Sequence, residues 1–182
     1  MPLSLIDIAT LFNRHGHSQY SGEPVTQQEH ALQTALLAEQ AGADDELVTA
    51  ALLHDLGHLL VGLGDSPSLR GIDDLHQFRV LPFLRGVFGH RVLETVQYHV
   101  AAKRYLCAIR AGYLEALSPD SQRSLALQGG VFSDAEASQF ITLPHAQDAV
   151  ALRLWDDQAK QSGLQTPPLQ HYLDRAQRCR LG

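Results

Sequence analysis

Apolar residues recur three or four positions apart along most of this chain, which is the spacing of one face of an α-helix. Leu5, Ile8, Leu11 and Phe12 open the series. Comparable segments follow, separated by Gly, Pro and Ser residues that interrupt helices. The further helices that this pattern predicts cover residues 25–40, 44–60, 73–85, 90–99, 103–108, 113–117, 118–128, 144–160 and 169–180. No segment alternates convincingly between apolar and polar residues, so the predicted fold class is all-α.

Local signals at the helix ends support this division. Pro24 stands at an early helical position, Asp44 or Asp45 suits an N-cap, and Ser133-Asp134-Ala135-Glu136 resembles a capping box. Residues 61–71 combine Gly, Ser, Pro and Asp and are expected to form a loop.

The composition is that of an ordinary globular protein. With 182 residues, 45% hydrophobic and 19% charged, the chain can bury a sizeable core, and we expect a single domain over residues 1–182. A net charge of −6 argues against a nucleic-acid partner. No apolar run approaches the ~20 residues of a membrane span, and no signal peptide is evident. Cys107 and Cys179 lie far apart and are expected to be free thiols of a cytoplasmic protein.

The run Ala50-Ala51-Leu52-Leu53-His54-Asp55-Leu56-Gly57-His58 is the strongest candidate for chemistry. On a helix, His54 and His58 at positions i and i+4 would share a face, with Asp55 one step round. Imidazole and carboxylate ligands suit iron, manganese, zinc or nickel. The flanking leucines would bury the pair, and a buried carboxylate is costly unless it is paired or bound to a metal. The pattern therefore predicts a metal site on a core helix.

Further candidate ligands lie on other predicted helices. One metal could be held by His30, His54, Asp55 and Asp156, and a second by His76 and His99, with Asp55 bridging the two. Taken singly, His30 or His99 is more often a core or capping residue than a ligand, and Asp156 is more often an exposed carboxylate. The remaining histidines fit no such pattern and are expected on the surface, namely His15, His17, His90, His145 and His171.

The ordered set of these candidate ligands resembles that of the HD-domain superfamily, whose members are mostly metal-dependent phosphohydrolases. The resemblance implies an HD-domain helical bundle with the metal site in its core. His76 and His99 resemble the extra ligands of the two-metal subset. That subset includes mixed-valence di-iron oxygenases, of which myo-inositol oxygenase is one.

Four further segments make the chain similar to the HD oxygenases that cleave phosphonates, over about residues 18–160. These segments are Tyr20-Ser21-Gly22-Glu23-Pro24 with Gln28-Glu29-His30, His99-Val100-Ala101-Ala102-Lys103-Arg104-Tyr105-Leu106, Leu127-Gln128-Gly129-Gly130, and Ala151-Leu152-Arg153-Leu154-Trp155-Asp156-Asp157. Those enzymes oxidatively cleave the carbon–phosphorus bond of 1-hydroxyphosphonates. The best known substrate is 2-amino-1-hydroxyethylphosphonate, which gives glycine and phosphate.

This resemblance implies two iron ions, Fe²⁺ and Fe³⁺, in the two predicted sites, and O₂ as co-substrate. His58, Lys103 and Arg153 would contact the phosphonate. Tyr20 and Glu23 resemble the family's mobile pair and would complete the catalytic set with His58. In that pair the Tyr can occupy an iron before substrate arrives, and the Glu helps to bind the amino end of the substrate. A 2-oxoglutarate-dependent hydroxylase that makes the 1-hydroxyphosphonate is the implied upstream partner.

The residue types suit such chemistry. Arg matches phosphonate oxygens in a bidentate manner and Lys acts as a point charge, although Lys103 and Arg153 read alone are equally well surface charges. Hydrolysis of the carbon–phosphorus bond would need a carbanion to leave, whereas oxidation at C1 offers a route. Glu23 favours a primary ammonium on the substrate. Tyr20, Tyr98 and Tyr105 could offer an aromatic face, which leaves a trimethylated substrate open. Hydroxymethylphosphonate would leave Glu23 without an obvious partner.

Two other functions remain open from the sequence. A metal-dependent HD phosphohydrolase acting on a nucleotide or a phosphate monoester would use the same ligands, but it gives no role to Tyr20, Glu23 or the Lys103-Arg104-Tyr105 segment. A non-catalytic HD domain that binds a ligand and signals would not need the full ligand set.

Overall fold

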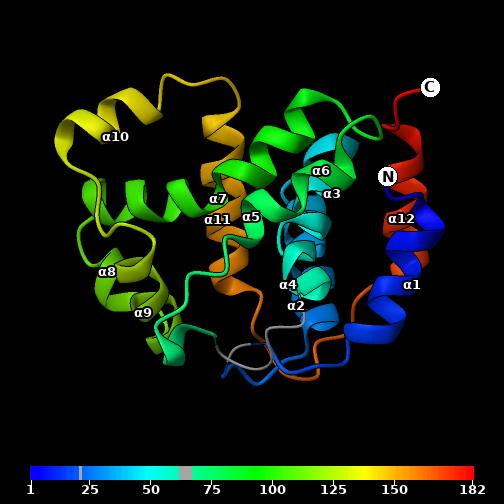
Figure 1. Cartoon of the computed structure of the whole chain (residues 1–182), viewed down its shortest axis with the longest axis horizontal. Helices are drawn as coiled ribbons and strands as arrows, with labels where there is room; N and C mark the ends of the chain where they lie inside the picture. The colour runs from blue at the N-terminus through cyan, green and yellow to red at the C-terminus, as the bar shows by residue number, and fades with distance from the viewer. Residues whose placement is uncertain (21, 62–66) are drawn as a thin grey trace.

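The computed structural model describes residues 1–20, 22–61 and 67–182, and helices dominate them (Figure 1). The helices are α1 Leu5–His15, α2 Gln27–Gln40, α3 Asp45–Leu53, α4 Leu56–Val61, η1 Pro67–Arg70, α5 His76–Arg79, α6 Leu81–Leu84, α7 His90–Ile109, α8 Tyr113–Ala116, α9 Pro119–Leu127, α10 Asp134–Phe140, α11 Ala146–Gln158 and α12 Leu169–Arg178. Extended residues in the described ranges form isolated bridges but no strand. The all-α prediction is confirmed. Ser21 and residues 62–66 of the expected loop lie outside the described residues.

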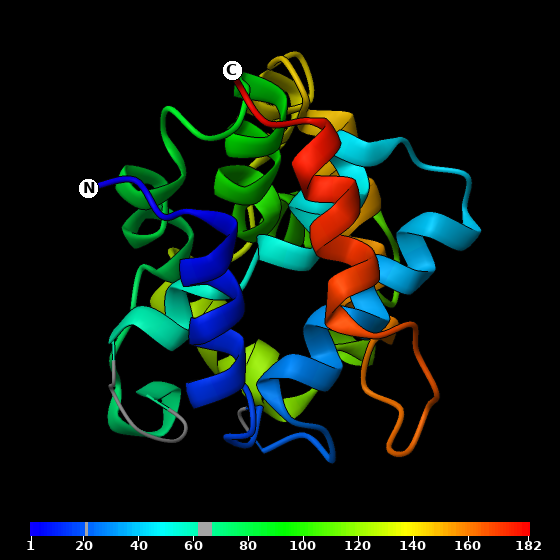
Figure 2. The same cartoon turned by 90° about the vertical axis from the view of Figure 1, so that its right-hand side faces the viewer.

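The long helices α7 and α11 cross near the middle of the molecule (Figure 1). Helices α2 and α3 pack against this pair, and α12 covers α3. Helix α1 lies beside α12, and the two termini are at this side of the molecule (Figure 2). The short helices α8, α9 and α10 lie at the opposite side (Figure 1). The four helices α2, α3, α7 and α11 carry or flank most of the candidate ligands.

Helix caps follow the predicted signals in part. Ser133 and Glu136 form the capping box of α10, and Asp44 caps α3 by accepting a hydrogen bond from the Leu47 amide at 3.1 Å. The predicted start of α2 after Pro24 is wrong. Thr26 and Glu29 form a capping box there, and the helix begins at Gln27. Each of the two side chains accepts a hydrogen bond from the other residue's backbone amide, which would otherwise lack a partner at the start of the helix.

Four of the predicted helices are divided or joined differently in the structure. The helix expected over 44–60 is broken at His54 and Asp55, between α3 and α4. The segments expected over 90–99 and 103–108 form one helix, α7, since the alanines between them are strong helix formers. The helix expected over 73–85 is divided into α5 and α6, because the ring of Pro82 would clash with the carbonyl four residues before it.

The prediction of surface histidines is largely confirmed. Of the five histidines expected on the surface, four are exposed, while His145 is half-buried and lies 3.6 Å from Asp148. Cys107 and Cys179 are free cysteines. None of the described helices is both long and apolar enough to cross a membrane.

Candidate metal centre

His54 and Asp55 lie at the break between α3 and α4 rather than on a continuous helix. His54 itself keeps helical dihedral angles, with φ −57° and ψ −38°. Its Nε2 lies 3.3 Å from Asp55 Oδ2. The two predicted ligands therefore lie together at the junction of α3 and α4.

The predicted ligands form two adjacent groups that Asp55 connects. His30, His54 and Asp156 make the first group, and Asp55, His76 and His99 make the second. Asp55 Oδ2 faces the first group, at 3.3 Å from His54 Nε2 and 3.6 Å from His30 Nε2. Asp55 Oδ1 faces the second, at 3.3 Å from His76 Nε2 and 3.5 Å from His99 Nε2. Each carboxylate oxygen thus serves one group, which is the geometry of a bridging ligand.

Backbone carbonyls set the tautomer of three of these histidines. Nδ1 lies 2.9 Å from the Ala159 oxygen in His30, 2.9 Å from the Ala51 oxygen in His54, and 2.7 Å from the Val96 oxygen in His99. A carbonyl oxygen only accepts hydrogen bonds, so Nδ1 carries the proton and Nε2 keeps its lone pair. Hydrogen bonds of this kind orient metal-binding imidazoles in many proteins.

The Nε2 atoms of the buried histidines point at one another. Those of His30 and His54 are 3.3 Å apart, and those of His76 and His99 are 3.0 Å apart. In addition, Asp156 Oδ1 is buried and accepts no hydrogen bond from the described residues. Lone pairs that converge in a dry interior repel each other unless a cation lies between them. The residues present therefore fit one metal ion in each group.

The carboxyl groups of the centre are held ionised. Burial would raise the pKa of Asp55, but the facing His54 and His58 keep it well below its usual range. Burial likewise opposes ionisation of Asp156, and the adjacent Arg153 guanidinium outweighs it and keeps the pKa low. Both carboxylates are thus available as ligands at neutral pH.

The imidazoles of the second group show how strongly the site favours positive charge. Burial would lower the pKa of His76, but its hydrogen bonds to Asp55 and Asp74 raise it to about 10. Burial and the neighbouring His76 and His54 lower the pKa of His99 well below its usual range. The second group therefore favours positive charge, but its two imidazoles cannot both be protonated. A bound metal ion can supply that positive charge instead.

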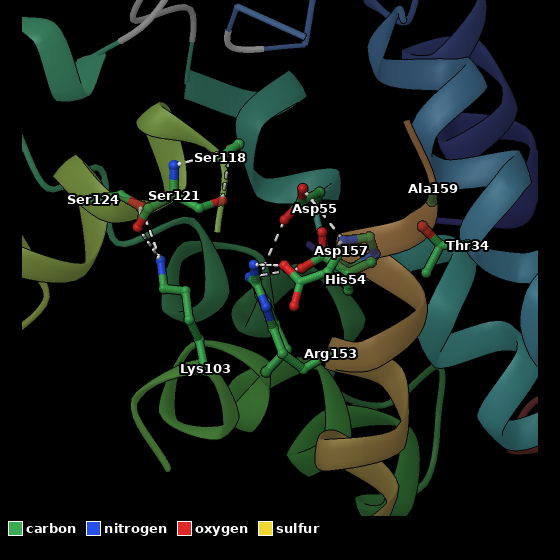
Figure 3. Close-up of polar contacts among 12 residues, drawn as sticks. Thr34, His54, Asp55, Lys103, Ser118, Ser121, Ser124, Arg153, Asp157 and Ala159 are labelled. Atoms are coloured by element: carbon green, nitrogen blue, oxygen red, sulfur yellow. Dashed lines mark hydrogen bonds and ion pairs between the residues drawn. The ribbon is translucent and has the colours of Figure 1, made fainter. Parts of the chain in front are cut away.

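A cavity of about 60 Å³ opens beside the two groups, and Tyr20, His58, Lys103 and Arg153 are among its lining residues. The two cations are not surface charges, because Lys103 is 2% and Arg153 is 5% exposed. Lys103 from α7 points toward α9, where its Nζ donates to Ser124 Oγ at 2.8 Å (Figure 3). The sequence-predicted phosphonate contacts thus share one cavity.

Arg153 and Lys103 have different partners. Arg153 Nη1 lies 2.8 Å from Asp156 Oδ2, and Nη2 pairs with Asp157. Within the described part of the chain, Lys103 donates hydrogen bonds to the Ser121 carbonyl and to Ser124 Oγ, and to no carboxylate. Burial and the nearby charge of Arg153 lower the pKa of Lys103 to about 7. Lys103 is therefore a buried ammonium whose charge a bound anion would stabilise.

Tyr20 and Glu23, which the resemblance treats as a pair, have different surroundings in the structure. The Tyr20 ring stacks on the His30 ring, with centroids 3.9 Å apart, and burial followed by the charges of Asp55 and Asp156 raises the pKa of its phenol well above the usual value. Glu23 is not among the cavity-lining residues. Its carboxylate instead pairs with Lys160, at 3.0 Å.

Asp74 is a site residue that the sequence reasoning missed. Its Oδ1 lies 2.7 Å from His76 Nδ1, and its Oδ2 lies 2.6 Å from His58 Nδ1. One carboxylate therefore orients a predicted ligand and a predicted substrate contact. The signal that could have found Asp74 is its position two residues before His76, since carboxylates commonly support metal-binding imidazoles.

Comparison with known proteins agrees with this arrangement. A family model described as HD domain matches residues 28–128. The chain is 46% identical over 170 residues to a hydroxymethylphosphonate dioxygenase of Gimesia maris, which covers 93% of this chain and 84% of that protein. It is 39% identical over 171 residues to a 1-hydroxy-2-(trimethylamino)ethylphosphonate dioxygenase (glycine-betaine-forming) of Leisingera caerulea, which covers 94% of this chain and 87% of that protein.

Proposed function

The chain belongs to the HD domain family, and on that premise we propose that it is an O₂-dependent di-iron dioxygenase that cleaves the carbon–phosphorus bond of a 1-hydroxyphosphonate. The observation that carries the proposal is the placement of a carboxylate-bridged pair of ligand groups beside a cavity with two buried cations. Two relatives of similar length are phosphonate dioxygenases by name. A hydrolase needs a bound phosphate too, so the names of the relatives are what favours oxygenase over hydrolase chemistry.

Lys103, Arg153 and His58 would hold the phosphonate group. A buried ammonium and a guanidinium bind a phosphonate dianion strongly when their N–H groups donate to its oxygens, because hydrogen bonds between charged groups are stronger than those between neutral ones. Arg153 is held by Asp156 and Asp157, so its side chain is in place before the ligand arrives. His58 is held by Asp74, and its Nε2 faces the cavity side of Asp55, at 3.6 Å from Oδ1. These supports orient the substrate without reorganisation.

The metal ions would be held by the two groups that Asp55 joins. When bound, a pair of iron ions supplies a Lewis acid for the 1-hydroxyl group and electrons for O₂. Tyr20 lies over His30 at the cavity wall, and its protonated phenol can cover the centre and exclude water. The apolar residues around the centre limit side reactions of the oxidant.

We further propose which tail the substrate carries and which enzyme supplies it. An amino tail, as in 2-amino-1-hydroxyethylphosphonate, is expected if the Glu23 carboxylate is free to read it. The 1-hydroxyl group must be installed by an earlier hydroxylation, for which a 2-oxoglutarate-dependent hydroxylase is the expected partner. Free thiols at Cys107 and Cys179 support a cytoplasmic location.

The deciding experiment measures phosphate release and O₂ uptake together. We expect protein loaded with ferrous iron to consume O₂ and release phosphate from a 1-hydroxyphosphonate in air, and to give background phosphate under nitrogen. A mixed-valence electron paramagnetic resonance signal should accompany the active form. Robust turnover without O₂, with manganese, nickel or cobalt, would instead assign the chain to the phosphohydrolases.

A further inference from the structure

The carboxylate of Glu23 is already engaged by a cation of the chain itself. Lys160 Nζ lies 3.0 Å from Glu23 Oε1, and each of the two side chains is 15% exposed. Lys160 Nζ also lies 3.4 Å from Ser118 Oγ. A half-buried carboxylate in such a contact has its charge compensated before any substrate arrives.

The backbone around Lys160 is tied to α2. Gln33 Nε2 donates to the Gln161 carbonyl at 2.7 Å, and the Gln161 amide donates to Gln33 Oε1 at 3.0 Å. On the other side, the Ala159 carbonyl accepts from the His30 ring at 2.9 Å. Lys160 therefore stands between two anchored residues. The segment that orients a metal-centre histidine also directs the Lys160 ammonium.

The ion pair is connected through hydrogen bonds to two residues that line the cavity. The Glu23 amide donates to the carbonyl of Tyr20, a lining residue, at 2.7 Å. On the opposite side, Ser118 Oγ, which receives Lys160, lies 3.2 Å from Oγ of Ser121, another lining residue. A substrate tail that reaches past Tyr20 toward Glu23 would thus meet a carboxylate whose partner is already in place.

We propose that Lys160 is a specificity-determining residue, whose ammonium occupies the Glu23 carboxylate and so favours a 1-hydroxyphosphonate without a cationic tail over an aminated one. The inference rests on the function proposed above. An ammonium tail would have to displace Lys160 or stay unpaired, and both outcomes weaken binding. Hydroxymethylphosphonate makes no such demand.

Glu23 does not line the cavity, whereas the carboxylates of Asp73 and Asp120 do and could also meet an ammonium tail. Asp120 is paired with Arg123, at 3.0 Å. Asp73 is half-buried, and its Oδ1 accepts a hydrogen bond from the Leu75 amide at 3.2 Å. Asp73 is therefore the alternative carboxylate for binding an ammonium tail.

The test compares kcat/KM for hydroxymethylphosphonate and 2-amino-1-hydroxyethylphosphonate in the iron-loaded wild type, Lys160→Met and Lys160→Arg. We expect the wild type to prefer hydroxymethylphosphonate. Lys160→Met should shift the ratio at least tenfold toward the aminated substrate, mainly through KM, since it leaves the Glu23 carboxylate unpaired. Lys160→Arg keeps a cation beside Glu23 and should stay near the wild-type ratio. Melting temperature and iron content identify a variant that merely folds poorly, and calorimetry under nitrogen should show the same shift in affinity.

Second-site variants locate the carboxylate responsible. In the Lys160→Met background, Glu23→Gln should abolish the gain, whereas Asp73→Asn should retain it. Loss of the gain with Asp73→Asn alone would overturn the inference, as would a folded, iron-loaded Lys160→Met variant with the wild-type ratio, or a wild type that prefers the aminated substrate. In those cases the proposed function stands. Absence of phosphate release from every 1-hydroxyphosphonate in air would overturn both.

Discussion

A β-carbon on Gly57 would lie 2.2 Å from the carbonyl oxygen of His76. That distance is far inside van der Waals contact, and the obstacle is backbone, so it cannot move aside as a flexible side chain would. The absence of a side chain at Gly57 therefore lets α4 approach the start of α5. This approach allows His58 to stack on His76, with ring centroids 4.0 Å apart, and it sets where His76 meets Asp55.

We expect Gly57→Ala to displace His76 and so to weaken the second ligand group. Overpacking of this kind costs about 1–3 kcal/mol of stability, and loss of support for a ligand lowers metal affinity about 10–100-fold. Metal analysis after dialysis should give close to half of the wild-type iron, with kcat/KM reduced at least about tenfold. Gly89→Ala is the matched control, because a β-carbon there meets only Glu46 Oε1, at 3.5 Å. Equal iron content in the two variants would contradict the argument.

The two oxygens of Asp55 face different ligand groups, and this leads to an asymmetric prediction for ligand variants. Asp55→Ala should remove both metal ions and abolish activity, because a single carboxylate completes both sites. His76→Ala should chiefly empty the second site and leave about one ion per chain. Iron content by mass spectrometry, with circular dichroism to confirm folding, distinguishes the two variants. An Asp55→Ala protein that retains two irons and full activity would rule out the bridge.

The ligand set was accessible from the sequence because each ligand stands in a helical segment with recognisable neighbours. His30 lies among apolar residues, and His54-Asp55 follows a run of alanines and leucines. Their convergence was not accessible from helical periodicity, which placed His54 and His58 on one face. The break at His54 and Asp55 lies beside ligands contributed by α2, α7 and α11, and helical periodicity carries no signal for it.

The supports of the centre depend even more on tertiary contacts. Glu23 and Lys160 are 137 positions apart, and neither has a local signal that predicts their ion pair. Asp74 is close to His76 in sequence, but its contact with His58 exists only because α4 and α5 meet at Gly57. The misplaced helix start at Thr26 depended on a side-chain capping box that competes closely with alternative starts.

Replacement of Lys103 should lower activity without lowering the stability of the substrate-free protein. A buried ammonium without a carboxylate partner is costly to fold around, so Lys103→Met should keep or raise the melting temperature of the substrate-free protein. The same change removes a charged hydrogen bond to the phosphonate, worth roughly 1.5–3 kcal/mol, or about a ten- to hundredfold loss in kcat/KM. Thermal melts and steady-state kinetics on one preparation test both effects. A lower melting temperature with unchanged kcat/KM would show that Lys103 has only a structural role.

The lowered pKa of Lys103, about 7, also predicts the pH dependence of substrate capture. The charged or titratable groups that influence it are Arg153, Asp156, Asp157 and Cys107. As the pH rises through 7, the free enzyme loses the ammonium proton, so kcat/KM should fall toward alkaline pH. Lys103→Arg keeps its charge over this range and should flatten the alkaline limb with the same substrate. An identical alkaline limb in the two proteins would assign the titration to another group.

The last prediction concerns the contact that ties the C-terminal helix to the start of α3. Asp45 Oδ2 lies 2.6 Å from Arg178 Nε, and Asp45 Oδ1 lies 2.6 Å from Arg175 Nε. The hydrogen bond from Arg178, aided by Arg175 against the effect of burial, lowers the pKa of Asp45 from 3.8 to about 2. Because the folded state holds this pKa below its unfolded value, the contact stabilises the protein above pH 3.8, and the stabilisation is lost as the pH falls toward 2. Asp45→Asn should therefore lower the melting temperature at neutral pH by about 2–4 °C, as expected for roughly 1 kcal/mol in a part-exposed ion pair, and the difference from wild type should shrink in acid. Asp174→Asn is the control, since Asp174 is exposed and its Oδ1 accepts from Gln170 Nε2, at 2.7 Å, and it should change the melting temperature little at either pH. A deficit in Asp45→Asn that persists unchanged at about pH 2 would show that the aspartate acts through packing or the helix start rather than through its charge.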